Sequence, residues 1–465
     1  MHTEMSGRVR VIKRREGKGG RGGGGVISPA RASAFEVLRR VEEEGAFAAP
    51  LLAAVELSAE DRALCYELVL GVLRRQLWLD RAAEHFAGRE AAKLDPPVRR
   101  ALRLGLYQLR FLSRIPARAA VNESVNLVHA ARLRSAAPFV NAVLRRAVRE
   151  KEFDPAAGVR DPLERVSVET SHPAWLIGRW ADAFGMEEAR AFALANNTNA
   201  PAAFRVNPLR AESETVVERL RAAGVAVEPS RVAPDAWRVA GGAAASALRE
   251  AAEAGAVYMQ DEASQLVAHV LGPRPGERVL DACAAPGSKA TQITALALDR
   301  ARVLAGDLHA HRLRVVRESA ARQGSQGVSL AVLDAARTLP FADATFDRVL
   351  VDAPCTGTGT LRHNPEIRWR AAPADIAELS ALQRRILGEA ARVLRPGGRL
   401  VYSTCSVERE ENEEVVADFL RAREDFRQVA ASPAPSSLLL PSGAARTWPH
   451  RDDVDGFFVA ALEKK

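Results

Sequence analysis

A regular alternation of short apolar segments and helical segments after about Glu253 constrains the fold more than any other feature of the sequence. Five apolar segments read as strands: ERVLDA, ARVLAGD, VSLAVLD, FDRVLVDA and GRLVYST. Segments of helical periodicity separate them, and this order predicts a doubly wound, mostly parallel sheet. The closing segment GFFVAAL predicts an antiparallel edge strand. We therefore expect residues 253–465 to form one α/β domain.

The first strand-to-helix turn of this domain reads VLDACAAPGSKATQI. Pro286, Gly287 and Ser288 turn the chain, and Lys289 begins a helix whose free N–H groups face the crevice beside the sheet. The turn lacks the G-x-G-x-x-G pattern of dinucleotide sites. It suits a cofactor without phosphates, such as S-adenosylmethionine.

Acidic residues close four of the predicted strands: Asp281, Asp307, Asp334 and Asp352. Any one of them can be explained as a helix N-cap. Four at the carboxyl ends of one sheet favour a ligand site, because these ends line the crevice of an open α/β sheet. Asp307 lies 26 residues after Asp281, a spacing suited to ribose hydroxyls, and Asp334 is placed to accept from an adenine amine.

The turn sequence CAAPGSK closely resembles CAAPGGK, the signature of the RNA cytosine-C5 methyltransferases, with Ser288 in place of the second glycine. Serine is small and can cap the helix, so we expect cofactor binding to survive this change. The segments DAPCTGTGTLRHNPEIRWR and YSTCSVEREENEEVV are similar to the two cysteine motifs of the same family. The resemblance implies a Rossmann-like methyltransferase domain with a mostly parallel seven-stranded sheet. It also implies contacts to S-adenosylmethionine from Cys283, Ala284, Ala285, Pro286, Gly287, Ser288, Lys289, Asp307, Asp334 and Asp352.

Methylation of cytosine at C5 needs covalent help, because C5 alone is too weak a nucleophile. A thiolate added at C6 makes C5 reactive; the methyl group is transferred, the C5 proton leaves and the thiol is eliminated. Cys405, Cys355 and Asp352 are residues of the required types at neighbouring strand ends. The sequence itself leaves open which cysteine attacks, since DNA cytosine methyltransferases use a Pro-Cys cysteine. The resemblance to the RNA family implies that Cys405 is the nucleophile, that Cys355 assists elimination and that Asp352 holds and protonates the base edge.

A basic loop with an aromatic residue follows Cys355 and is suited to RNA phosphates and bases flanking a flipped target. Its candidate residues are Arg362, His363, Arg368 and Trp369. The four cysteines of the chain contain no C-x-x-C pair, so neither a disulfide framework nor a zinc site is expected. A reducing, cytoplasmic location is the corresponding expectation. Cys65 is interpreted as a small buried hydrophobic residue.

Residues 28–152 are helical in pattern throughout. The sequences AEDRALCYELVLGVLRR, LRLGLYQLRFLSRIPARAAVNESVNL and FVNAVLRRAVRE resemble the NusB-like antitermination-factor domain. The resemblance implies an all-α bundle that contacts RNA through surface basic residues. Candidates are Arg99, Arg100, Arg103 and Arg110, with an ordinary solvated helix face as the alternative.

The net charge of +8 is concentrated at the front of the chain. Residues 1–27 form a Gly-rich basic segment that is expected to be a disordered tail. Residues 28–150 contain twenty basic against fourteen acidic side chains, so we expect a polyanion to bind mainly there. Residues 153–252 predict a small α+β domain, similar to the RRM-like segment that precedes the catalytic domain in this family.

Taken together, these features predict a methyltransferase that forms 5-methylcytosine in small-subunit (16S) ribosomal RNA, expected to act as a monomer without a metal or a membrane. A transfer-RNA cytosine-C5 methyltransferase shares the same catalytic core and is one alternative. Another is an RNA-binding assembly or antitermination factor with a vestigial methyltransferase domain. The NusB-like region argues against the first alternative, and the presence of Cys405, Cys355 and Asp352 argues against the second.

Overall fold

The computed structural model describes residues 26–241 and 245–465, so the tail predicted for residues 1–27 lies almost wholly outside the described residues. The described chain forms two compact units. The first contains the chain as far as Thr198 together with Leu361–Arg370, and the second contains Asn199–Thr360 and Ala371–Lys465. The division at Thr198 falls inside the segment 153–252 that the sequence assigns to one small domain.

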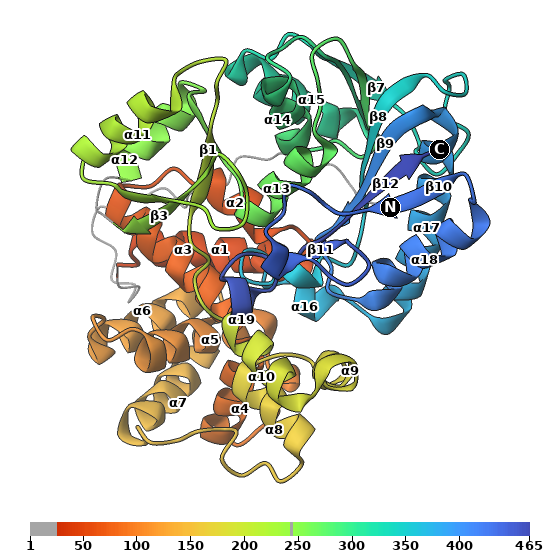
Figure 1. Ribbon diagram of the computed structural model, residues 1–465. Coiled ribbons are helices and arrows are strands. Elements are labelled where there is room, and N and C mark those ends of the chain that lie inside the picture. Colours follow the sequence, from red (N-terminus) through yellow and green to blue (C-terminus); the bar gives the residue numbers. More distant parts are fainter. Residues whose placement is uncertain (1–25, 242–244) are drawn as a thin grey trace. The chain divides into compact units, whose positions relative to one another are not determined.

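The first unit is helical throughout its described residues, as the red to yellow ribbons of Figure 1 show. Leu38, Leu68, Leu102 and Leu144 come from four different helices and share one buried core, which confirms the predicted bundle. Ser58 caps one helix by accepting a hydrogen bond from the Asp61 N–H at 3.2 Å. The α-helices of this unit are α1 (Pro29–Glu43), α2 (Ala48–Ala53), α3 (Ala59–Arg74), α4 (Gln76–Ala87), α5 (Pro96–Phe111), α6 (Ala117–Ala130), α7 (Ala137–Arg149), α8 (Pro162–Thr170), α9 (Ala174–Phe184), α10 (Met186–Ala195) and α16 (Ile367–Arg370).

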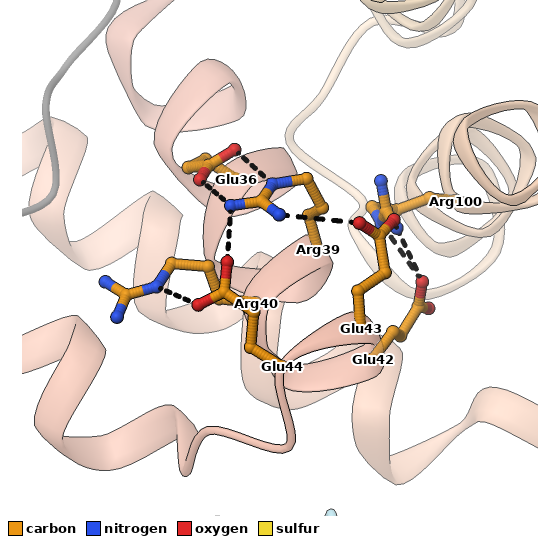
Figure 2. A network of polar contacts seen from close by, with 7 residues as sticks. All are labelled: Glu36, Arg39, Arg40, Glu42, Glu43, Glu44 and Arg100. Atoms are coloured by element: carbon orange, nitrogen blue, oxygen red, sulfur yellow. Dashed lines mark hydrogen bonds and ion pairs between the residues drawn. The ribbon is translucent and has the colours of Figure 1, made fainter. Parts of the chain in front are cut away.

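Arg100 on α5 does not face solvent, although the sequence offers it for RNA contact. Only 1% of its surface is exposed, and its guanidinium binds Glu42 at 2.9 Å and Glu43 at 2.7 Å. Figure 2 shows these acids beside a second ion-pair group in which Arg39 binds Glu44 at 2.8 Å. The acids at the end of α1 therefore already neutralise Arg100, and the prediction that this residue binds RNA is wrong.

Arg103 and Arg110 are also engaged within the bundle. Arg103 is buried and binds Asp80 at 2.7 Å and Glu42 at 2.6 Å. Arg110 donates to three backbone carbonyls at and just beyond the end of α7, a favourable place for a cation. The prediction of an RNA contact is wrong for Arg103, and the alternative of a solvated helix face is wrong for it as well.

The segment Leu361–Arg370 belongs to the helical unit, although Cys355 precedes it in the sequence by only a few residues. Its centre is Arg368, which is fully buried. The Arg368 guanidinium donates five hydrogen bonds, to the side chain of Asn197 and to the carbonyl oxygens of Arg74, Ser171, Asn196 and Leu361. Arg362 is 1% exposed and its carbonyl oxygen accepts from Arg74. The prediction that Arg362 and Arg368 contact RNA is therefore wrong, because both are built into the interior of the helical unit.

Replacing Arg368 by alanine should lower the free energy of unfolding by about 3 kcal/mol or more, because five buried acceptors lose their donor at once. The measurement is urea unfolding of the full chain followed by far-UV circular dichroism. Arg118→Ala is the matched control, since Arg118 is an exposed residue of the same unit, and it should change stability by no more than about 0.5 kcal/mol. Equal midpoints for the two variants would contradict the anchoring role of Arg368.

The second unit contains a small antiparallel sheet in the strand order β2-β3-β1-β4. Its strands are β1 (Ala203–Val206), β2 (Ala226–Pro229), β3 (Ala236–Gly241) and β4 (Val257–Met259), accompanied by α11 (Ser213–Ala222) and α12 (Ala245–Glu253). Arg205 of β1 is buried and donates to the Thr291 hydroxyl at 3.0 Å and to the Gln323 side chain at 2.9 Å. These bonds fix the small sheet against two helices of the same unit, α14 (Ser288–Leu296) and α15 (Ala310–Gln323).

The large sheet of the second unit runs in the order β10-β12-β9-β8-β5-β6-β7 among the described residues. Neighbouring strands from β7 to β9 are parallel, whereas β12 is antiparallel to both β9 and β10. The strands are β5 (Arg278–Asp281), β6 (Arg302–Asp307), β7 (Val328–Val332), β8 (Phe346–Asp352), β9 (Leu394–Thr404), β10 (Phe426–Val429) and β12 (Phe458–Lys464), and the short β11 (Ala445–Arg446) pairs with β12. The mostly parallel sheet is confirmed. The prediction that β12 is an edge strand is wrong, because the half-polar segment FRQV forms β10, which pairs with β12 and lies at the edge.

Alternate residues of each central strand face opposite layers of helices. Val279 and Leu350 point toward one core, and their neighbours Leu280 and Val349 point toward the other. The first core is covered by α13 (Glu262–Leu271), α14 (Ser288–Leu296) and α15 (Ala310–Gln323), and the second by α17 (Pro373–Val393) and α18 (Glu413–Ala422). Both faces of the sheet are therefore closed, and the carboxyl ends of the parallel strands form the edge at which side chains can meet a ligand.

Candidate active site

The turn between β5 and α14 is held to the neighbouring strand by its backbone. The Ala284 N–H donates to the Gly306 carbonyl at 2.8 Å, and the Gly287 N–H donates to the Ala284 carbonyl at 2.7 Å. Gly287 has φ +100°, and a Cβ at this position would lie 3.1 Å from the Cα of Val316. Glycine is thus required here by both conformation and space. Gly287 also occupies the N-cap position of α14, so the prediction that Ser288 caps this helix is wrong.

Two of the predicted cofactor acids close their own turns with one carboxylate oxygen. Asp307 accepts from the His309 N–H at 3.0 Å, and Asp334 accepts from the Ala336 N–H at 3.0 Å. The second oxygen of Asp307 pairs with Arg312 at 3.2 Å, at the point where Arg312 also binds the Ala285 carbonyl. The second oxygen of Asp334 pairs with Arg337 at 3.3 Å, so both acids stabilise the turns in which they lie.

Asp281 is a buried acid at the same strand ends. Burial, and next the charge of Asp352, raise the pKa of Asp281 to about 7, against the opposing effect of the Lys289 ammonium. Asp307 adds to the negative field. An edge with this excess of carboxyl groups fits a cationic ligand whose hydroxyl and amine groups donate hydrogen bonds. The residues present therefore fit the sulfonium, ribose and adenine of S-adenosylmethionine.

The raised pKa of Asp281 makes the stability of the second unit depend on pH. Between about pH 4 and pH 7 Asp281 keeps its proton in the folded protein but has lost it in the unfolded chain. The free energy of unfolding therefore falls as the pH rises through this range, until Asp281 is deprotonated in the folded protein at about pH 7. Asp281→Asn should gain stability relative to the unmodified protein across this window, by up to about 1.4 kcal/mol per pH unit. Urea midpoints measured at several pH values test this, with the exposed Glu318→Gln as control. A pH-independent difference would contradict it.

Lys289, which is buried, forms an ion pair with the partly exposed Asp352, between the turn that precedes α14 and the end of β8. The Lys289 Nζ lies 2.7 Å from Asp352 Oδ2, and the Ser403 hydroxyl donates to Asp352 Oδ1 at 2.7 Å. Burial alone would lower the pKa of Lys289, but Asp352, together with Cys405 and Asp281, raises it above its usual value. The pair therefore places a fixed carboxylate and a charged ammonium side by side, next to Cys405.

The two candidate catalytic cysteines meet at the same place. Cys355 Sγ and Cys405 Sγ are 3.5 Å apart, and both residues are partly exposed. The neighbouring Cys405, then burial, and also Glu411 and Asp352 raise the pKa of Cys355 well above its usual value. Cys65 and Cys283 lie elsewhere, and burial is the main cause that raises the pKa of each of them. Only Cys355 and Cys405, among the four cysteines, are thus paired with each other.

Sequence reasoning missed Glu411, a fully buried acid beneath the cysteine loops. It lies within the run VEREENEE, whose charge density is typical of an exposed surface, and nothing in this run distinguishes the buried Glu411 from the exposed Glu414. The sequence also placed Lys289 only with the cofactor, whereas the structure pairs its ammonium with Asp352.

Two features are absent from the described residues. No group of three or more His, Cys, Asp or Glu side chains is arranged to hold a metal ion. None of the described helices has the length and apolar character needed to cross a membrane.

Comparison with known proteins agrees with this arrangement. The model of the family described as 16S rRNA methyltransferase RsmB/F matches residues 268–463. The NusB family model matches residues 28–149, and the ferredoxin-like domain model of the RsmF/B-like methyltransferases matches residues 172–245.

Relatives cover almost the whole chain. A probable ribosomal RNA small subunit methyltransferase B of Bacillus subtilis is 37% identical over 94% of this chain and 98% of its own length. The ribosomal RNA small subunit methyltransferase B of Pseudomonas putida is 36% identical over 88% of this chain and 92% of its own length. The crystal structure of the protein PH0851 is 30% identical and superposes with a TM-score of 0.81 over 94% of this chain and 99% of its own. With a matching family model and relatives of this identity and coverage, the chain belongs to the ribosomal RNA small subunit methyltransferase B family, a family of RNA methyltransferases.

Proposed function

We propose that this protein transfers a methyl group from S-adenosylmethionine to C5 of one cytosine in small-subunit (16S) ribosomal RNA, through a covalent bond between Cys405 and cytosine C6. The observation that supports this most directly is the 3.5 Å separation of the Cys355 and Cys405 sulfurs beside the Lys289–Asp352 pair. A thiolate, a second sulfur and an acid group are the functions that cytosine C5 methylation requires.

Asp352 and Lys289 hold the edge of the base. The Asp352 carboxylate accepts a hydrogen bond from the exocyclic amine of cytosine, and its position is fixed by Ser403 and Lys289. The ion pair also supplies the proton that cytosine N3 gains when the ring is attacked. A base inside a helix has to be unstacked and flipped to reach this edge.

Cys405 is the nucleophile in this proposal. Its sulfur lies near the Lys289 ammonium, whereas the charge of Glu411 is among the causes that raise the pKa of Cys355. The Cys405 thiolate adds to C6, the proton from the Lys289–Asp352 pair goes to N3, and C5 becomes nucleophilic. Bound S-adenosylmethionine supplies an electrophilic methyl group for C5.

Cys355 completes the reaction. Once Cys405 is bonded to carbon, the hydrogen bond between the two sulfurs, which is the largest cause of the raised Cys355 pKa, is lost, and Cys355 releases its proton to water. Cys355 then accepts the C5 proton, the C6–sulfur bond breaks with Cys405 leaving as thiolate, and the N3 proton returns to the Lys289–Asp352 pair. Each proton and electron pair in the cycle is thus accounted for.

The residues that hold the cofactor are those of the turn and the strand ends. Cys283, Ala284, Ala285, Pro286, Gly287, Ser288 and Lys289 form the turn, and Asp307, Asp334 and Asp352 provide the acceptors. Asp307 is suited to the ribose hydroxyls and Asp334 to the adenine amine.

Bisulfite sequencing of ribosomal and transfer RNA from cells that lack the protein tests the proposed substrate. One cytosine of small-subunit ribosomal RNA should lose its methyl group and regain it when the intact protein is restored. Naked 16S RNA should be methylated in vitro faster than assembled small subunits. Loss of methylation in transfer RNA alone, or no change in any RNA, would contradict the proposal.

A further inference from the structure

Glu411 is a fully buried carboxyl group that bridges the two cysteine loops. It ends the short 3-10 helix η4 (Arg409–Glu411). Its Oε1 accepts from the Thr356 N–H at 2.9 Å and from the Gln383 side chain at 3.0 Å. Its Oε2 lies 2.5 Å from the Thr356 hydroxyl and 2.5 Å from the Ser406 hydroxyl.

The partners of Glu411 are the residues that directly follow the two sulfurs. Thr356 follows Cys355 and Ser406 follows Cys405. The hydroxyls of these two partners are themselves 3.1 Å apart, and the Gly359 N–H donates to the Cys405 carbonyl at 2.9 Å. One carboxyl group therefore ties both loops at the point where each sulfur leaves the backbone.

Glu411 also acts on Cys355 through its charge. Its charge is among the causes that raise the pKa of Cys355, whereas Lys289 lies on the side of Cys405. Burial raises the pKa of Glu411 itself, against the hydrogen bonds from Ser406, Thr356 and Gln383. Oε1 is therefore an acceptor of two N–H groups, the backbone N–H of Thr356 and the side-chain NH2 of Gln383.

We propose that Glu411 is a positioning residue that sets the spacing of Cys355 and Cys405 and assigns their separate roles, with Cys405 as nucleophile and Cys355 as proton acceptor. The inference rests on the proposed covalent route. Glu411 touches no reacting atom in this scheme. It acts through the two loops that it ties and through its charge, which raises the pKa of Cys355.

The isosteric variant Glu411→Gln removes the negative charge but keeps a side chain that can hydrogen-bond to both cysteine loops. The glutamine carbonyl can still accept from Thr356 and Gln383, and its amide can donate to the two hydroxyls, so the loops remain joined. Without the charge, the Cys355 thiolate should form at lower pH. Glu411→Ala removes the tie as well, and the rate of adduct formation should fall about 100-fold, the scale of a misplacement of about 1 Å.

The first readout needs no RNA. The full chain is alkylated with iodoacetamide at a series of pH values, and modification of the Cys355 peptide is followed by mass spectrometry, because the thiolate is the reactive form. In Glu411→Gln the midpoint for Cys355 should shift to lower pH by about one unit. Glu414→Gln, an exposed acid of the same run with no such ties, is the control and should leave the midpoint unchanged. An unchanged midpoint in Glu411→Gln would overturn the assigned charge effect.

The second readout is single-turnover adduct formation with RNA that carries 5-fluorocytidine at the target, because fluorine cannot leave as a proton does and the adduct persists. If the unmodified protein forms no adduct, the proposed function fails. If it forms an adduct and Glu411→Ala matches Glu414→Gln, the proposed function stands and this inference fails. Should Glu411→Ala not fold, Thr356→Val and Ser406→Ala each remove one hydroxyl bond to Glu411, and each should slow adduct formation about fivefold; rates equal to the control would overturn the inference.

Discussion

Replacing Cys405 by alanine should abolish methyl transfer, with a loss of about 10,000-fold or more, the scale that follows removal of a catalytic nucleophile. Replacing Cys355 by alanine should have a different consequence. The adduct at Cys405 should still form and accept the methyl group, but the C5 proton then has no acceptor, and a stable protein–RNA complex should accumulate. Although the two sulfurs are only 3.5 Å apart, loss of Cys405 should block adduct formation and loss of Cys355 should block breakdown of the adduct.

These two variants are compared by incubating each with small-subunit ribosomal RNA and S-adenosylmethionine labelled in the methyl group. Label should remain on RNA bound to the Cys355→Ala protein in a denaturing gel, and should be absent with Cys405→Ala. Cys65→Ala is the control, because Cys65 is buried in the helical unit, and its turnover should match the unmodified protein. Accumulation of labelled adduct with Cys405→Ala and loss of all label with Cys355→Ala would reverse the assignment.

Replacing Asp352 by asparagine should lower the turnover rate by about 100- to 10,000-fold, the range expected when a group that transfers a proton in the transition state is lost. The asparagine side chain keeps the shape of Asp352 but leaves the buried Lys289 ammonium without its counterion at 2.7 Å. Ser403→Ala removes only the hydrogen bond to the other oxygen, and should lower turnover about five- to tenfold, the equivalent of one hydrogen bond.

Single-turnover rates, measured beside melting temperature and cofactor affinity, separate catalysis from folding in these variants. A smaller loss in Asp352→Asn than in Ser403→Ala would contradict the role of Asp352 at the base edge. So would a loss in Asp352→Asn that is explained wholly by unfolding.

The parts of the fold that the sequence predicts well are those with strong local patterns. Alternating Val and Leu runs, each closed by an acid or by Thr404-Cys405, define β5, β6, β8 and β9, since neighbouring residues face opposite cores. The strand β10 is not predicted from the sequence, because FRQV is short and half-polar. It is a strand because it pairs with β12.

The charged residues are harder to place because charge alone does not reveal burial. Three arginines that the sequence offers for RNA contact are instead bound within the protein. Arg100 and Arg103 pair with acids distant in the sequence, and Arg368 binds a distant side-chain amide. Glu411 shows the same difficulty for a negatively charged residue, because it is buried although it lies in a charged run. Its partners Thr356 and Gln383 are 55 and 28 residues away, and no local pattern connects them.

The most direct test of the covalent route is to trap the adduct with 5-fluorocytidine RNA, digest the complex and identify the modified peptide by mass spectrometry. We expect the nucleotide to be attached to Cys405 through C6 and the Cys355 thiol to be free. A nucleotide attached to Cys355, or the absence of any covalent complex during active methylation, would contradict it.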